Sequence, residues 1–174
     1  MFCGLGLVHS LDGDFSAFTR MVQLLSQSIH MAVIPMISET NMLGFSQSLH
    51  QQTSYVNSAS FASSVSHGHQ FSFLEQVHNH AADCILIVGS DPFSTLPQSL
   101  LGKLQGIDII CLDHFTTLTT DTADIVIPSA VPGVECRGSV VRLDGDSIML
   151  AEPIKNGYPT QEAILRQLLE KVQP

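Results

Sequence analysis

The stretch Cys84-Ile-Leu-Ile-Val-Gly-Ser-Asp-Pro-Phe-Ser-Thr95 decides the fold of this chain. An apolar run ends there abruptly in a polar loop. The same pattern returns in Ile109-Ile-Cys-Leu-Asp113 and in Thr122-Ala-Asp-Ile-Val-Ile-Pro128. Strand-like runs that alternate with helical segments are typical of βαβ units, whose strands are parallel. The three stretches therefore predict neighbouring strands of a mostly parallel α/β sheet.

Polar residues follow the ends of these predicted strands. In an open parallel sheet, ligands bind in the crevice outside the carboxyl ends of the strands. We therefore expect Gly89, Ser90, Asp91, Thr95 and Asp113 to line a site for a nucleotide-like ligand. Carboxylates accept hydrogen bonds from base N–H groups or ribose hydroxyls, and a threonine hydroxyl and backbone N–H groups can contact phosphate. An Asp-Pro pair after a strand can also simply cap the next helix, and the sequence leaves both roles open.

The rest of the chain predicts further α/β units and a different C-terminus. Asp144-Gly145 between two short apolar runs predicts a β-hairpin over 140–150. Pro159 is expected to open a final amphipathic helix. The other expected elements are strands at 2–8, 31–36, 85–88, 107–112 and 125–127, helices at 14–29, 42–49, 71–80 and 96–104, a helical turn at 116–122, and a long surface loop or partner-facing segment at 51–70.

These elements predict one fold class and one domain. We expect a Rossmann-like α/β fold, with helices on both faces of the sheet and a C-terminal hairpin plus helix. A chain of 174 residues, 44% of them apolar, can bury one sizeable core, so a single domain over 1–174 is expected. The helix at 71–80 should turn Phe73, Leu74 and Val77 inward.

Charge and hydropathy exclude some partners and favour others. The formal net charge is −9 with seven Lys and Arg, which disfavours binding to nucleic acid or to a membrane surface. No apolar run is long enough to span a bilayer and no signal peptide is evident, so a cytoplasmic protein is expected. The mean hydropathy of +0.25, with 13% charged residues, indicates exposed apolar surface and hence self-association or a missing partner.

The cysteines and histidines do not form a recognisable metal motif. Cys3, Cys84, Cys111 and Cys136 contain no C-x-x-C pair, so neither zinc nor an iron–sulfur cluster is expected, and Cys84 and Cys111 should be buried as small apolar residues. Cys136 beside Arg137 could be an activated thiol, but no base can be assigned to it. The histidines at 67, 69, 78 and 80 could meet at a metal, although solvated histidines are commoner in such a segment.

A series of motifs carries a family resemblance over nearly the whole chain. They are Gly4-Leu-Gly-Leu-Val-His9, Pro35, Asn41-Met-Leu-Gly44, Gly89-Ser-Asp-Pro92, Asp113-His-Phe115, Thr122-Ala-Asp-Ile-Val-Ile-Pro128 and Glu135-Cys-Arg-Gly-Ser139. Together they resemble the third domain of the molybdopterin oxidoreductases. Within that superfamily the chain is most similar to the B-type subunit of formylmethanofuran dehydrogenase, including its relative in the bacterial formyltransferase/hydrolase complex. Gln52-Thr53, Pro132-Gly-Val-Glu135 and Arg142-Leu-Asp-Gly145 favour this branch over formate dehydrogenase.

The resemblance implies a domain that binds part of a molybdopterin guanine dinucleotide cofactor carrying molybdenum or tungsten. Leu5 and His9 would line the pterin side, and Asn41 the turn over it. Asp91 and Thr95 would contact the guanosine-phosphate portion, with Asp113 at the next strand end. The complete complex would reduce carbon dioxide and load a formyl group on methanofuran, in methanogenesis or related one-carbon metabolism. The cysteines that ligate the family's iron–sulfur cluster and metal are absent here, so the chain alone is not expected to be catalytically competent.

Two departures from the family leave its role open. Ile37-Ser38 stands where the family has an arginine–glycine pair, and Arg137 stands where it usually has an acidic residue. Both favour a non-redox scaffold subunit like that of the formyltransferase/hydrolase complex, whereas Asn41, Asp91, Thr95 and Asp113 favour a cofactor-holding dehydrogenase domain. A third alternative is a generic nucleotide-binding domain, because Gly4-x-Gly6 matches part of a dinucleotide fingerprint although His9 stands in place of its third glycine.

Overall fold

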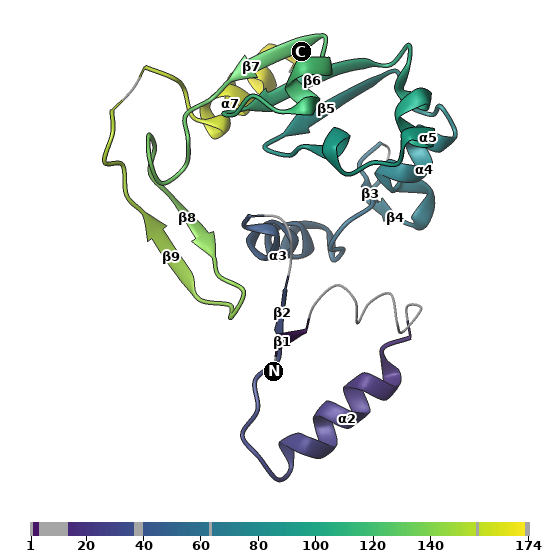
Figure 1. Ribbon diagram of the computed structural model, residues 1–174, viewed down its shortest axis with the longest axis vertical. Helices are drawn as coiled ribbons and strands as arrows, with labels where there is room; N and C mark the ends of the chain where they lie inside the picture. The colour runs from purple at the N-terminus through teal and green to yellow at the C-terminus, as the bar shows by residue number, and fades with distance from the viewer. Residues whose placement is uncertain (1, 4–13, 37–39, 63, 156, 173–174) are drawn as a thin grey trace. The chain divides into compact units, whose positions relative to one another are not determined.

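The computed structural model describes residues 2–3, 14–36, 40–62, 64–155 and 157–172 (Figure 1). The chain divides into two compact units. Unit 1 comprises Met1–Phe45 and Val140–Ile148, and unit 2 comprises Ser46–Ser139 and Met149–Pro174. No described helix has the length and apolar character needed to cross a bilayer. The single domain over 1–174 stays a prediction.

Unit 2 contains the parallel sheet that the sequence predicts. Its strands are β5 (Cys84–Val88), β6 (Asp108–Asp113) and β7 (Ile125–Pro128), with β6 in the centre and all three parallel (Figure 1). Val88 pairs with Leu112, and Asp113 pairs with Pro128, so the three strands end at one edge. The α/β fold class and the polar strand ends are confirmed.

One face of this sheet packs against short helices and forms the core. Those helices are α4 (Phe73–His78), α5 (Gln98–Leu101) and the 3-10 helix η3 (Gly102–Leu104). Val77 and Leu104 are buried together with Ile87, Ile109 and Cys111 of the strands. Apolar burial of this kind is the main favourable term in folding, so this cluster holds the strands in register.

The opposite face of the sheet remains partly open to solvent. Leu86 and Ile125 share that face by register with Ile110, and their side chains are 48% and 53% exposed. Leu112, further along β6, is completely buried. Parallel sheets normally have both faces covered, so the exposed part is apolar surface suited to further polypeptide.

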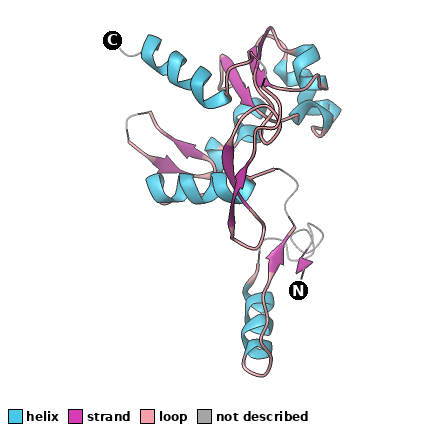
Figure 2. Ribbon diagram, turned by 90° about the vertical axis from the view of Figure 1, so that its left-hand side faces the viewer, coloured by secondary structure: helices cyan, strands magenta, loops and turns pink. Residues whose placement is uncertain are grey.

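The remaining elements of the C-terminal half follow the sequence closely. The 3-10 helix η2 (Pro92–Ser94) follows β5, and α6 (Leu118–Thr122) lies between β6 and β7. Strands β8 (Gly138–Val141) and β9 (Ser147–Leu150) form the predicted hairpin, and the helix α7 (Gln161–Val172) ends the described chain (Figure 2). The hairpin turn has Gly145 at φ +94°, a conformation that glycine adopts without strain, and its N–H donates to the Arg142 carbonyl at 2.9 Å.

Unit 1 contains one parallel strand pair and two helical segments. Strand β1 (Phe2–Cys3) pairs with β2 (Ile34–Pro35), and α2 (Ser16–Ser26) lies between them in sequence. Helix α3 (Met42–Thr53) begins in unit 1 and continues into unit 2. The carboxylate of Asp14 accepts a hydrogen bond from the Ser16 N–H at 2.9 Å, although Phe15 occupies the N-cap position. The helix is shorter than the predicted 14–29, and its apolar residues are largely exposed.

Some local predictions are wrong. The segment predicted as a loop over 51–70 contains the end of α3, an antiparallel pair of β3 (Ala59–Ser60) with β4 (Ser66–His67), and the start of the 3-10 helix η1 (His69–Phe71). The Tyr55 ring stacks on His67 with centroids 4.7 Å apart, which fixes part of this segment. The helix predicted over 96–104 begins only after Pro97, and its last turn is the 3-10 helix η3 instead of a continuation of α5. Phe73, Leu74 and Cys84 are exposed rather than buried.

Candidate functional site at the carboxyl ends of the sheet

Gly89 stands at the carboxyl end of β5 in a conformation that favours glycine. Its φ is +59°, and its N–H donates to the Leu112 carbonyl of β6 at 2.9 Å. A Cβ at this position would lie 3.2 Å from Nε2 of Gln161, the first residue of α7. The backbone conformation and the close approach of the amide both favour glycine at this strand end.

Asp91 is joined to α6 across 28 residues of sequence. Its Oδ1 accepts one hydrogen bond from the Thr119 hydroxyl at 2.6 Å and a second from the Thr119 N–H at 3.0 Å. The Thr119 hydroxyl also accepts a hydrogen bond from the Phe93 N–H at 3.2 Å. We call these three hydrogen bonds the Asp91–Thr119 clasp. The Asp91 side chain does not cap η2, the helix that follows it. Of the two roles that the sequence left open for this residue, capping of the next helix is therefore not formed.

The clasp also sets the electrostatics of Asp91. The hydrogen bond from the Thr119 hydroxyl lowers the pKa of this carboxyl, against a smaller opposing effect of burial, and Ser94 adds a lesser lowering. The carboxylate therefore stays ionised under neutral conditions, as a strong hydrogen-bond acceptor.

Asp113, at the end of β6, is buried and uses its carboxylate within its own loop. Oδ1 accepts hydrogen bonds from the His114 N–H at 2.6 Å and from the Phe115 N–H at 3.1 Å. The His114 ring nitrogen Nδ1 lies 3.6 Å from the same oxygen. The carboxylate therefore shapes the turn after β6 as well as standing at the predicted ligand edge.

The two hydroxyl residues predicted for this edge differ in exposure. Ser90, between Gly89 and Asp91, is half-buried. Thr95 is exposed, and its hydroxyl donates to the Pro92 carbonyl at 3.2 Å. The structure thus brings Gly89, Ser90, Asp91 and Asp113 to the edge formed by β5 and β6, with Thr95 one turn further along the chain.

Three buried polar atoms near this edge lack a hydrogen-bond partner among the described residues. They are His114 Nδ1, Ser129 Oγ and Gln161 Nε2. His114 follows β6 and Ser129 follows β7, while Gln161 lies against Gly89 at the end of β5. The Ala130 N–H donates to the Pro159 carbonyl at 2.9 Å, which fixes the start of α7 beside the end of β7. Buried polar groups are nearly always hydrogen-bonded, so these three atoms remain available to hydrogen-bond a ligand or water.

Sequence reasoning missed these residues for different reasons. His114 and Ser129 directly follow predicted strands, and the rule that selected Gly89 could have selected them. Gln161 and Thr119 carry no such signal, because their contacts depend on how α7 and α6 pack.

The other predicted cofactor residues lie elsewhere in the chain. Asn41, in unit 1, has φ +56°, and its Oδ1 accepts a hydrogen bond from the Val141 N–H at 2.8 Å. This bond ties the residue before α3 to strand β8. Leu5 and His9 lie outside the described residues, as do Gly4, Gly6 and the Ile37-Ser38 departure.

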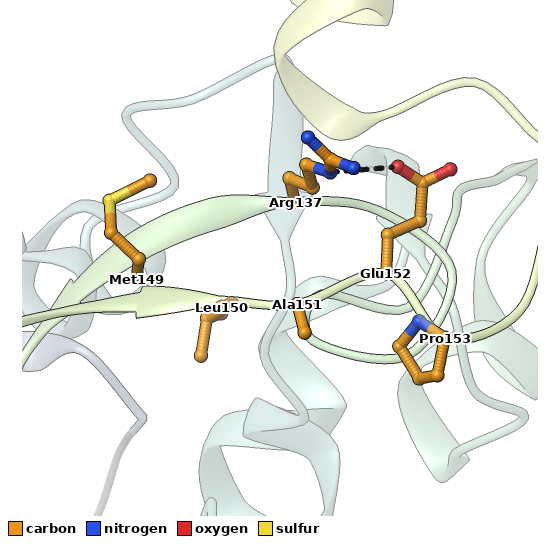
Figure 3. Close-up of a pocket in the computed structure, with 6 residues that line it drawn as sticks. All are labelled: Arg137, Met149, Leu150, Ala151, Glu152 and Pro153. Carbon is orange, nitrogen blue, oxygen red and sulfur yellow. Dashed lines mark ion pairs between the residues drawn. The ribbon is translucent and has the colours of Figure 1, made fainter.

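A shallow hollow of roughly 480 Å³ lies in unit 2, around the end of β9 and the residues that follow it (Figure 3). Its lining comprises Arg137, Met149, Leu150, Ala151, Glu152 and Pro153. Arg137 Nε lies 3.6 Å from a Glu152 carboxylate oxygen, as the dashed line in Figure 3 marks. Arg137, the basic residue that departs from the family pattern, is therefore paired with an acidic residue of the same unit.

The thiols and histidines of the described residues do not assemble into a reactive or metal-binding cluster. Burial raises the pKa of the Cys136 thiol, and the carboxylates of Glu152 and Glu135 raise it further, which opposes an activated thiolate. The pKa of the buried Cys111 thiol is raised in the same way, first by burial. No described group of three or more His, Cys, Asp or Glu side chains could hold a metal ion.

The strand ends fit the polar parts of a pterin nucleotide better than they fit a metal ion. The left-handed Gly89 leaves its backbone free of a side chain, and the unpaired atoms of Ser129, Gln161 and His114 can donate or accept hydrogen bonds. Hydroxyl, amide and imidazole groups suit ring nitrogens, carbonyls and sugar hydroxyls. The residues present therefore fit the organic part of such a cofactor, while the metal would need ligands from outside the described residues.

Comparison with known proteins supports the resemblance seen in the sequence. No protein-family model matches the chain. It is 31% identical over 164 residues to the B-type subunit of tungsten-containing formylmethanofuran dehydrogenase 2 of Methanocaldococcus jannaschii, and 28% identical over 167 residues to the protein of the same name from Methanococcus maripaludis. Each match covers 91% of this chain but 35% of the relative. The chain thus spans about a third of the length of the curated relatives that it matches.

A solved structure supports the fold. The chain resembles part of the crystal structure of the formyltransferase/hydrolase complex (FhcABCD) from Methylorubrum extorquens with methylofuran, at a TM-score of 0.68 and 19% identity. The match covers 87% of this chain and 44% of that one, and at this identity it is evidence for the fold alone. Over 91% of its length, the chain is thus similar to about a third of the B-type subunit of tungsten-containing formylmethanofuran dehydrogenase 2.

Proposed function

We propose that the chain is one part of a formylmethanofuran dehydrogenase-type subunit, within a complex of one-carbon metabolism, and that its sheet edge helps to hold a metal–pterin cofactor. Both curated relatives are named as tungsten-containing. The observation that carries the proposal is the set of unpaired buried polar atoms of His114, Ser129 and Gln161 beside the ends of β5, β6 and β7. The cytoplasmic location inferred from the sequence belongs to the same proposal.

In this proposal each residue of the edge has a defined task. Gly89 lets the ligand approach the backbone, and Ser90 and Ser129 offer hydroxyls at adjacent strand ends. The carboxylate of Asp91 and the buried carboxylate of Asp113 would accept hydrogen bonds from N–H or hydroxyl groups of the ligand. The Thr95 hydroxyl would contact phosphate. Asn41, Leu5 and His9 are proposed for the pterin side. When bound, the cofactor would supply the redox chemistry.

The partners in this proposal are the remainder of the subunit and the other subunits of the complex. The chain spans about a third of its curated relatives, so the metal ligands and any iron–sulfur cluster would lie outside it. The exposed apolar part of the sheet, around Leu86 and Ile125, is consistent with burial against further polypeptide.

A second candidate is a scaffold subunit without redox chemistry, as in a formyltransferase/hydrolase complex. A specific observation favours it, since Asp91 and Asp113 already use Oδ1 in bonds to their own chain. Arg137 likewise pairs with Glu152 instead of facing a ligand unopposed. In that case the strand ends would be a degenerate pocket.

Pterin retention separates the two candidates. The native complex would be purified through a tagged copy of this chain, and pterin released by acid oxidation would be measured by fluorescence. The cofactor-holding role predicts stoichiometric pterin in the wild type and less in Gly89→Val, whose side chain would meet the Gln161 amide. An intact complex without pterin would leave the scaffold role. Gly102→Val is the matched control, because a Cβ there meets no atom within 4 Å.

A further inference from the structure

The Asp91–Thr119 clasp joins side chains 28 positions apart in the sequence at the proposed ligand edge. Thr119 is completely buried, and a threonine hydroxyl has one hydrogen to donate and lone pairs to accept with. Here it donates to Asp91 Oδ1 at 2.6 Å and accepts from the Phe93 N–H at 3.2 Å. One hydroxyl therefore binds two points of the segment after β5 to the first turn of α6.

We propose that Thr119 is a positioning residue, which fixes the Asp91 carboxylate and the Phe93 backbone so that the 89–93 segment is formed before a ligand arrives. That a ligand contacts this segment rests on the proposed function, whereas the clasp itself does not. Fixing a loop in advance removes its ordering cost from ligand binding. Thr119 does this through Asp91, without needing to touch the ligand.

The clasp does more than cap a helix. The α6 N-terminus already has its own cap, because the Thr117 hydroxyl accepts from the Thr120 N–H at 3.2 Å and Thr120 reciprocates. Asp91 serves a different amide, that of Thr119, from a separate strand end. The Phe93 N–H would lose its acceptor without the Thr119 hydroxyl, whereas the cap by Thr117 would remain. The hydroxyl therefore links β5 to α6 independently of local helix capping.

The chain offers conservative variants and a matched control. Thr119→Val keeps the volume and β-branched shape of the side chain but removes the hydroxyl. Thr119→Ser keeps the hydroxyl and removes a methyl group. Thr122→Val, in the same helix, removes an exposed hydroxyl whose hydrogen bond goes to the Leu118 carbonyl and not to the 89–93 segment.

Hydrogen exchange on the intact complex, purified through this chain and followed by mass spectrometry, tests the proposal. In Thr119→Val, peptides over 89–96 should exchange about tenfold faster, as expected from losing a hydrogen bond to a charged group. Peptides over β6 should be unchanged. Thr119→Ser and Thr122→Val should both exchange like the wild type. If Thr119→Val does not assemble, Asp91→Ala removes the acceptor from the other side of the clasp, and peptides over 89–96 should again exchange faster while those over β6 do not.

Three results would overturn the proposal. They are wild-type exchange in Thr119→Val, an equal rise over β6 that marks general destabilisation, and failure of Thr119→Ser to restore slow exchange. Pterin content measured on the same samples keeps the two proposals apart. A pterin-free wild-type complex would contradict the proposed function, whereas unchanged exchange in a pterin-containing complex would contradict only the role of Thr119.

Discussion

Asp91 combines a structural bond with a place at the proposed ligand edge. Its sequence context, between a strand and a proline, suggests a cap or a ligand contact, and the structure adds a third role through Thr119. A carboxylate held in one orientation stabilises the fold through its bonds to Thr119 and would present its other oxygen to a ligand in a fixed position. Its ionisation therefore links stability to pH in a predictable direction.

Asp91→Asn should show this linkage. The hydrogen bond from Thr119 lowers the pKa of Asp91 in the folded chain, so the ionised carboxylate stabilises the fold above about pH 4 and that contribution is lost as the pH falls through the folded pKa. The variant should unfold at a lower temperature than the wild type at neutral pH. The gap should narrow as the pH falls below about 4, the range in which the unfolded chain takes up the proton first. Thermal unfolding by circular dichroism measures it, and a gap that does not change with pH would refute this linkage.

Gly89→Ala tests the backbone at the end of β5. A non-glycine residue at φ +59° costs about 1 kcal/mol or more, which lowers the unfolding temperature by about 2–4 °C in a chain of this size. Gly102→Ala is the control, since its φ is −61° and no atom lies within 4 Å of the added Cβ. The control should be neutral or stabilising. Equal losses in both variants, measured by differential scanning calorimetry, would argue against strain at Gly89.

At the scale of elements, the sequence predicts what depends on local pattern. The strands β5, β6 and β7 follow from continuous apolar runs, and the hairpin of β8 and β9 follows from Asp-Gly chemistry. The pair of β3 and β4 has two-residue strands, too short for any period to be read. Leu74 satisfies a helical pattern but is exposed, and of the six residues of α4 Val77 is the buried one. The ligand edge was predicted at the strand ends, whereas Gln161 and Thr119 depend on tertiary packing.

Leu112→Ala tests the central strand. Leu112 is completely buried, and truncating such a leucine costs about 2–5 kcal/mol through lost burial and the remaining cavity. Leu86→Ala, at a half-exposed position on the neighbouring β5, should cost much less in the chain alone. Urea unfolding of both variants gives the comparison. A similar loss for both would mean that the exposed face of the sheet is covered.

At the scale of the whole molecule, the chain combines partial coverage of its relatives with negative charge and exposed apolar surface. It spans about a third of its curated relatives, carries a net charge of −9, and exposes apolar side chains on β5 and β7. Self-association of the isolated chain remains a prediction of that surface. Its proposed ligand edge has polar groups for a pterin nucleotide but, among the described residues, no metal-binding cluster. In the proposed function, other polypeptide of the complex would complete the site.

Whether the chain helps to hold a metal–pterin cofactor is tested by the tungsten and molybdenum content of the native complex purified through this chain. Inductively coupled plasma mass spectrometry measures both metals. About one metal atom is expected for each copy of the chain, held with pterin, because both relatives are named as tungsten-containing. An intact, active complex with neither metal would contradict it and identify the chain as a scaffold.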